Sequence, residues 1–268
     1  MALLPNEFQE QTGHSPEADN LLRLALDVGQ GMLASGGEIH RVEDTISRIC
    51  RAYGAEHTEI FAIPSLILAA IRMKDGGYSS QIRRLDNTEN FLHRLEQYND
   101  VSRRICREVP PLEEAERMIR QAKQVRTYPM WLRITGGSIA AGAFAIFFGG
   151  DLWDFVVSAL IGAVMYSIDM ISFGQINRLA KTVLQSFIGG TLACLAIQLG
   201  LGHDMGAIMI GTIMVLIPGL AFGTAFRDLL CGDFLAGTWK TVQCILAALM
   251  IAAGYLLAML LVMGGGIG

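Results

Sequence analysis

Long apolar stretches occupy the second half of the chain, and each is about as long as a membrane-spanning helix. A helix needs roughly 20 apolar residues to cross the hydrocarbon core of a bilayer. Five stretches after Tyr128 meet this requirement: Trp131–Gly150, Leu152–Gly174, Thr182–Gly202, Met205–Phe226 and a last one from Thr241 towards Gly268. The pattern predicts a membrane domain with about five transmembrane helices over residues 131–268.

The first half of the chain has shorter, mixed patterns that are typical of a soluble α+β domain. Apolar residues recur at helical spacing in four segments, which are Leu21–Ser35, 39–53, Asn87–Cys106 and Pro111–Val125. Between the second and third of these, Glu59–Met73 is rich in Ile, and Asp75–Gly76–Gly77 follows it. This part favours short strands with a hairpin turn at the glycine pair. We therefore predict a cytoplasmic α+β domain over residues 1–130.

Composition and charge support this division of the chain. Of its 268 residues 52% are hydrophobic, and the mean hydropathy is +0.41. Residues 1–130 carry 16 of the 21 Lys and Arg and 19 of the 25 Asp and Glu. An apolar half that follows a charged half predicts an α-helical integral membrane protein with an N-terminal soluble α+β domain.

The basic residues between the predicted spans predict the orientation in the membrane. Arg is frequent before the first span, Arg178 and Lys181 follow the second, and Arg227 and Lys240 follow the fourth. The other loops and the tail hold no Lys or Arg. Because basic loops stay in the cytoplasm, we expect the N-terminus inside and the C-terminus outside.

Several function classes have little support in the sequence. The net charge is −4 without a basic block, so we expect no nucleic-acid partner. The five Cys are scattered without a CxxC pair and the His are isolated, which indicates neither a metal site nor a cofactor. VGQGMLA at Val28–Ala34 fits a GxGxxA pattern, but it lies inside a predicted helix, where a dinucleotide site would need a preceding strand.

Asp169 is an acid well inside the second predicted span. Asp169 is close to the inner end of the second span, and Gln175 and Asn177 follow at a similar level. An acid near a helix centre is unfavourable by about 2.5–3.5 kcal/mol on insertion scales, and less near the interface. Asp169 is therefore either an interfacial carboxylate in headgroup water or part of a proton or substrate relay.

The fourth span contains a helix-breaking pair close to two charges. Pro218 and Gly219 interrupt it, and Arg227 and Asp228 follow at its end. Pro removes a backbone donor, and unpaired backbone groups at membrane depth persist only inside protein or beside a wet cavity. Broken helices of this kind line substrate sites in transporters, and Arg227 is suited to attract a carboxylate. The alternative is a simple proline kink with an interfacial stop signal.

Three tracts of the chain resemble the threonine/serine exporter family of bacterial transporters. They are SGGEIHRVEDTISRICRAYG at 35–54, the tract from Pro64 through Asp75–Gly76, and LIPGLAFGTAFRDLLCGDFLAGTWK at 216–240. The resemblance covers essentially the whole chain. It marks Glu38, Arg41, Glu43, Pro218, Gly219 and Asp228 as motif positions without a separate role for each.

The resemblance implies a specific kind of transporter subunit. Fused members of that family have a second set of spans, whereas this chain has about five, as does the larger subunit of the split members. We therefore expect a bacterial inner-membrane exporter subunit that works with a small multi-span membrane partner, within an oligomer. The small-molecule substrate would be threonine or serine, or a dicarboxylate such as succinate, and export would be proton-coupled. A membrane-anchored hydrolase that uses Glu38 and Glu43 is an alternative, although the chain lacks a nucleophile–base pair and is not expected to be an enzyme. A scaffold or sensor subunit is the other.

Overall fold

The computed structural model describes residues 15–85, 91–124, 128–170 and 178–264, with the backbone alone at 169, 170, 178 and 263. These residues form two compact units. The N-terminal unit contains the described part of residues 1–126 together with Gly223–Trp239, and the helical unit contains the described part of 127–222 and of 240–268. The division into a soluble domain over 1–130 and a membrane domain over 131–268 stays a prediction.

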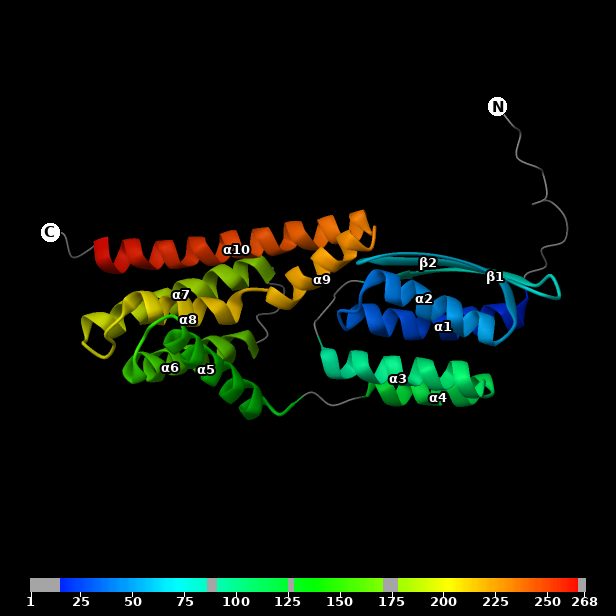
Figure 1. The fold of residues 1–268 in the computed structure, drawn as a ribbon, viewed down its shortest axis with the longest axis horizontal. Coiled ribbons are helices and arrows are strands. Elements are labelled where there is room, and N and C mark those ends of the chain that lie inside the picture. The colour runs from blue at the N-terminus through cyan, green and yellow to red at the C-terminus, as the bar shows by residue number, and fades with distance from the viewer. Residues whose placement is uncertain (1–14, 86–90, 125–127, 171–177, 265–268) are drawn as a thin grey trace, which may run out of the picture. The chain divides into compact units, whose positions relative to one another are not determined.

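The N-terminal unit has three layers (Figure 1). Strands β1 (Ala55–Ile63), β2 (Leu66–Met73) and β3 (Tyr78–Arg84) form an antiparallel sheet in the order β1-β2-β3. Helices α1 (Pro16–Ala34) and α2 (Ile39–Ala52) pack on the sheet, and α3 (Leu92–Glu108) and α4 (Leu112–Lys123) pack on these helices. The predicted α+β character of this part is confirmed.

The sequence explains where the elements of this unit begin and end. Ser15 caps α1 by accepting the N–H of Ala18, so the helix begins earlier than its apolar stripe suggests. Pro64 lies in the turn between β1 and β2, and Gly76, with φ 88°, lies in the turn between β2 and β3. A residue other than glycine is strained at that φ, which accounts for the hairpin at the glycine pair.

Two glycines let three helices of this unit approach closely. A Cβ on Gly29 would lie 2.4 Å from the side chain of Ile46 in α2, and a Cβ on Gly31 would lie 2.1 Å from the ring of Tyr98 in α3. Both distances are far below van der Waals contact, so α1 packs against its neighbours on two sides with glycine at the closest points. The GxGxxA pattern thus lies inside a helix, as predicted, and serves its packing.

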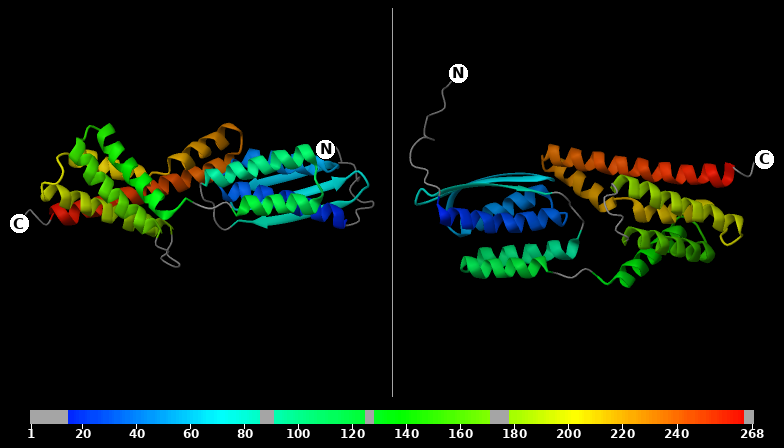
Figure 2. Two further views of the ribbon diagram at one scale, coloured as in Figure 1. Left: turned by 90° about the horizontal axis from the view of Figure 1, so that it is seen from below. Right: turned by 180° about the vertical axis from the view of Figure 1, so that it is seen from behind.

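The helical unit is built from α5 (Met130–Phe147), α6 (Leu152–Met170), α7 (Arg178–Gln198) and α8 (Met205–Leu216), with the parts of α9 and α10 that belong to it. Helices α5 and α6 form an antiparallel hairpin, and α8 packs against both (Figure 2). Small residues lie at the crossings: a Cβ on Gly162 would lie 2.8 Å from Ala141, and one on Gly211 would lie 2.6 Å from the Ala141 carbonyl oxygen. Such residues let helices approach closely in lipid.

The helices have the length and composition of a helical membrane protein. Among the described residues, Met130–Phe147, Leu179–Gln198 and Phe234–Val262 are each long and apolar enough to cross a bilayer. Helices α8 and α9 (Gly219–Leu230) meet that condition only together, with a bend of 56° between them, and Leu152–Ile168 is apolar but shorter. Large apolar side chains are exposed along these helices, as expected for a surface in lipid. The count of about five spans stays a prediction.

Three helix boundaries differ from those predicted. Helix α9 runs to Leu230, so Arg227 and Asp228 lie inside it rather than beyond the span. Helix α10 (Phe234–Met263) begins well before Thr241, so Lys240 is helical rather than in a loop. Helix α7 begins at Arg178, before Thr182. The reason is the same in each case, because a charged residue ends an apolar pattern without ending a helix. Helix α9 ends only shortly before Gly232, the next residue after Pro218 with a positive φ, a conformation that commonly follows the end of a helix.

Candidate functional site

Residues 223–239, which we call the α9–α10 elbow, belong to the N-terminal unit although they lie far from it in sequence. Gly232, with φ 93°, reverses the chain between the two helices. A Cβ on Gly237 would lie 2.6 Å from Leu229 and 2.9 Å from the Ala225 carbonyl oxygen, so the arms of the elbow are in close contact. Ala236 is buried in the same apolar core as α1 and α2. The elbow is therefore a packed part of this unit.

An ion pair joins the elbow to the start of α2. The guanidinium Nη1 of Arg227 donates to the Glu38 carboxylate at 2.8 Å. The Glu38 side chain is 18% exposed and that of Arg227 is 64% exposed, so water screens the pair from one side. Glu38 is the N-cap residue of α2, where a negative charge also interacts favourably with the helix dipole.

A second carboxyl group of α2 approaches the elbow. Glu43 Oε1 accepts the backbone N–H of Ala62 in β1 at 2.7 Å. Burial raises the pKa of Glu43, the negative charge of Asp233 raises it further, and the Ala62 N–H and His40 oppose these effects. In the described structure, the Oδ2 atom of Asp233 is buried and has no hydrogen-bond partner. A proton on Glu43 would reduce its repulsion with Asp233.

Asp228 lies within the same elbow. Asp228 is 1% exposed, and its backbone carbonyl oxygen accepts the N–H of Asp233 at 2.9 Å. Buried carboxyl groups are rare because desolvation disfavours their charge, so the buried Asp228, together with the half-buried Glu43 and Asp233, makes this corner of the unit chemically unusual. Asp233 was not among the residues predicted from sequence. Its position directly before an apolar helix is the signal that could have marked it.

Arg41 does not join this group. Its Nη2 atom donates to the Asn99 side chain of α3 at 3.2 Å. It lines a cavity of about 400 Å³ between α2 and α3, with Asp44, Thr45, Arg48, Asn99, Ser102, Arg103, Cys106 and Arg107. The motif positions of α2 thus divide: Glu38 and Glu43 approach the elbow and Arg41 faces α3.

The predicted break in the fourth span is present. Helix α8 ends at Leu216, α9 begins at Gly219, and the Gly219 N–H donates to the Ile217 carbonyl oxygen at 2.8 Å. A Cβ on Gly219 or on Gly223 would meet no atom within 4 Å. Neither glycine therefore serves a close contact with another described residue of its own unit.

The remaining predicted polar residues of the second span cannot be placed. The backbone of Asp169 belongs to the last turn of α6, but its side chain lies outside the described structure. Gln175 and Asn177 lie outside the described residues. Their suggested part in a translocation path stays a prediction.

A carboxylate at the other end of α6 organises two loops and was missed by sequence reasoning. Asp154 is 1% exposed, and its side chain accepts the backbone N–H groups of His203 at 2.7 Å, Asp204 at 3.2 Å and Asp151 at 3.1 Å. The loop before α6 is thereby tied to the loop before α8. His203 also bonds the Asp151 carboxylate. The Asp154 N–H and His203 lower the pKa of Asp151, and Asp151 raises the pKa of His203.

Buried polar groups also link the helices inside the helical unit. The Tyr255 hydroxyl of α10 donates to Thr212 Oγ1 of α8 at 2.8 Å, and Gln185 Nε2 of α7 donates to the Met165 carbonyl oxygen of α6 at 3.2 Å. Each bond joins two helices where the surroundings are apolar, so these contacts fix helix register.

Comparison with known proteins supplies the family. Residues 23–262 match the model of the family described as "Putative threonine/serine exporter". The chain is 22% identical over 240 residues to the "Probable succinate transporter subunit YjjP" of Klebsiella aerogenes, covering 88% of this chain and 92% of that protein. The protein of that name from Escherichia coli is also 22% identical over 240 residues, with 88% and 93% covered.

A longer relative matches as well. The "Probable threonine/serine exporter" of Mycobacterium tuberculosis is 22% identical over 253 residues, which are 92% of this chain and 47% of that protein. The chain therefore spans about half the length of this relative. No solved structure matches the chain. Since the family model covers nearly all of the described sequence, the chain belongs to the threonine/serine exporter family of membrane transporters.

Proposed function

We propose that this chain is one subunit of a bacterial inner-membrane exporter that moves a small polar metabolite out of the cell. The substrate class would be threonine and serine or a dicarboxylate such as succinate, because the similar proteins carry both kinds of name. We expect no enzymatic step. A hydrolase would use Glu38 and Glu43 as its acids. Glu38 is paired with Arg227, however, and Glu43 accepts a backbone N–H from β1, so both carboxylates already have structural partners.

The match along almost the whole chain to a family of exporters carries this proposal. The proposal that the exporter has two subunits rests on the lengths of the relatives. The alignment covers 92% of a protein named as a transporter subunit and 47% of one named as an exporter. A second membrane protein would then supply the remaining helices.

The break at Pro218–Gly219 is the best candidate for the transport path. Breaking a helix frees backbone groups, which need protein or water around them. The open space beside Gly219 and Gly223 would accept helices of the partner subunit. In this arrangement α5, α6, α7, α8 with α9, and α10 form five spans, with the N-terminus in the cytoplasm and the C-terminus outside.

Proton coupling would need an acid whose charge changes during the cycle. Asp169 is the candidate in the span itself. Glu43 is a further candidate, because burial and the negative charge of Asp233 raise its pKa and so favour a proton there. Export against a gradient would then be driven by protons that enter the cell.

Reconstitution into liposomes tests the proposal. The tagged chain, the partner recovered with it from membranes, and the pair would each be inserted into vesicles loaded with labelled threonine, serine or succinate. We expect release from the pair only, faster when protons can flow in the opposite direction. Equal release from the chain alone would contradict the two-subunit account.

An acid variant tests the coupling within the same assay. Asp169→Asn should abolish the acceleration by a pH gradient while the protein still inserts, and Asp75→Asn in the β2–β3 turn serves as control. If a pH gradient still accelerates release fully in Asp169→Asn, Asp169 is an interfacial carboxylate and not part of a proton relay.

A further inference from the structure

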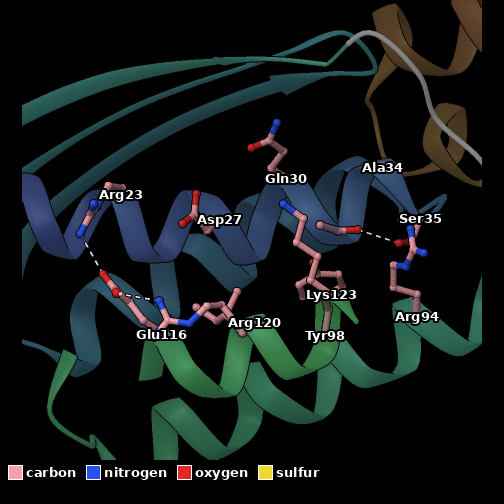
Figure 3. Close-up of a pocket in the computed structure, with 12 residues that line it drawn as sticks. Arg23, Asp27, Gln30, Ala34, Ser35, Arg94, Tyr98, Glu116, Arg120 and Lys123 are labelled. Atoms are coloured by element: carbon pink, nitrogen blue, oxygen red, sulfur yellow. Dashed lines mark hydrogen bonds and ion pairs between the residues drawn. The ribbon is translucent and has the colours of Figure 1, made fainter. Parts of the chain in front are cut away.

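A cavity of about 420 Å³ lies between α1, α3 and α4 in the N-terminal unit. Its volume lies in the range of small-ligand sites, which is about 300–1,000 Å³. Figure 3 shows polar and charged side chains around it from all three helices. The lining residues are Arg23, Asp27, Gln30, Gly31, Ala34, Ser35, Arg94, Tyr98, Glu116, Ile119, Arg120 and Lys123.

The lining contains four cations and two carboxylates, and the carboxylates already have partners. Glu116 accepts hydrogen bonds from Arg23 at 2.8 Å and Arg120 at 3.4 Å. Asp27 lies 3.9 Å from Arg83, and burial raises its pKa. These pairs leave the cavity with an excess of positive charge.

Two cations in the cavity form no ion pair within 4 Å among the described residues, although the charge of Lys123 acts on Asp27 and opposes the rise of its pKa. Lys123 comes from α4 and Arg94 from α3, and both side chains point towards α1 (Figure 3). The Nε atom of Arg94 is buried without a hydrogen-bond partner, while the guanidinium lies 4.8 Å from the centre of the Phe91 ring. A buried donor without an acceptor is unfavourable, so this atom indicates that an acceptor is missing.

We propose that this cavity binds a small doubly charged oxyanion, either a dicarboxylate or a phosphate group. Arg94 offers a planar pair of donors that suits either group, and Lys123 supplies the second positive charge. Gln30 of α1 also lines the cavity, but its amide nitrogen donates to the Arg84 carbonyl oxygen at 3.5 Å and is turned away from Arg94 and Lys123 (Figure 3). This site lies in the N-terminal unit and shares no residue with the transport path proposed above, so the proposal does not depend on transport.

Calorimetry on the purified full chain in detergent at low salt tests the site. Succinate and inorganic phosphate are the two dianion probes, and acetate is the singly charged control. We expect saturable binding of at least one dianion, at least about tenfold tighter than acetate because two charges contact two cations. The two probes then distinguish a dicarboxylate site from a phosphate site. No saturable dianion binding at millimolar concentration would overturn the proposal.

Matched variants separate the site from general charge. Arg94→Gln and Lys123→Gln should each weaken dianion binding about tenfold or more. Arg104→Gln on α3 and Arg117→Gln on α4 remove the same charge from the same helices outside the cavity, and they should leave binding unchanged. Equal weakening by all four variants would overturn the proposal. Arg94→Lys keeps the charge without the paired donors, so it should fold and bind weakly, and thermal unfolding of each variant checks its fold.

Discussion

The guanidinium of Arg227 in α9 lies 2.8 Å from the carboxylate of Glu38, a residue 189 positions earlier in the chain. The motif position Glu38 and the candidate substrate-binding residue Arg227, which the sequence suggested separately, are thus in direct contact within one compact unit. In this arrangement Arg227 already binds a carboxylate of the protein, that of Glu38, and not one of a substrate. A substrate that used Arg227 would have to compete with Glu38.

This pair should show a measurable but modest coupling. Glu38→Gln, Arg227→Gln and the double variant form a cycle, and the interaction energy from thermal or denaturant unfolding should be about 0.2–1 kcal/mol. The value should fall with added salt, because Arg227 is largely exposed. A coupling of zero at low salt would mean that the contact contributes nothing to stability.

Glu43 should make stability depend on pH in a defined direction. Its folded pKa is raised above the ordinary value of 4.5, so the folded state holds the proton more tightly than the unfolded state. Between these two pKa values the folded state binds more protons, and stability therefore falls as pH rises through that window. Melting temperatures measured from pH 4 to 7 should show this slope.

Glu43→Gln supplies the comparison for that measurement. Its side-chain oxygen can still accept the Ala62 N–H, but it does not titrate, so the slope should decrease. Glu113→Gln at the exposed start of α4 should leave the slope as it is. An unchanged slope in Glu43→Gln would assign the pH dependence to other groups.

Asp154 should be among the residues on which the helical unit depends most. Asp154→Asn replaces an acceptor of three backbone N–H groups by an amide with one oxygen, so at least one part-buried donor loses its partner. We expect a loss of about 1–3 kcal/mol, seen as a lower melting temperature in detergent. Asp75→Asn, in an exposed turn, should stay within about 0.5 kcal/mol of the unchanged protein.

The break in the fourth span should matter for transport in two distinguishable ways. Pro218→Ala restores a backbone donor and allows α8 and α9 to join, so export by the reconstituted pair should fall while insertion is retained. Gly219→Leu fills open space, so the chain alone should keep its melting temperature and the pair should associate less. Retention of the partner on affinity resin measures this, and normal association with Gly219→Leu would leave that space without a role.

Local elements could be predicted because periodic patterns depend only on nearby residues. Ile39, Val42, Ile46, Ile49 and Cys50 are all buried along α2, as their helical spacing indicates. The opposite face, with Arg41, Asp44 and Arg48, faces a cavity beside α3. Hairpin and proline break were likewise visible, since glycine and proline constrain the backbone wherever they occur.

The candidate site could be predicted only as separate pieces. An apolar run with a charge at its end does not reveal which other segment covers it, so the packing of Ala236 in the core of the N-terminal unit had no signal in the sequence. For the same reason, the approach of Asp233 to Glu43 and the three hydrogen bonds of Asp154 could not be predicted. These contacts depend on segments that are far apart in the sequence.

The glycine pattern of α1 has a consequence for how such chains are recognised. Gly29 and Gly31 are two positions apart, which is about 200° around a helix, so they face α2 and α3 on nearly opposite sides. A library of α1 variants selected for folding would therefore return the two glycines together, in the spacing of a nucleotide-binding motif. A motif search that takes no account of the surrounding helix would therefore mark this chain by glycines whose described contacts are those of helix packing. Replacement of either glycine should lower the yield of folded protein, because a Cβ at either position would overlap a neighbouring side chain.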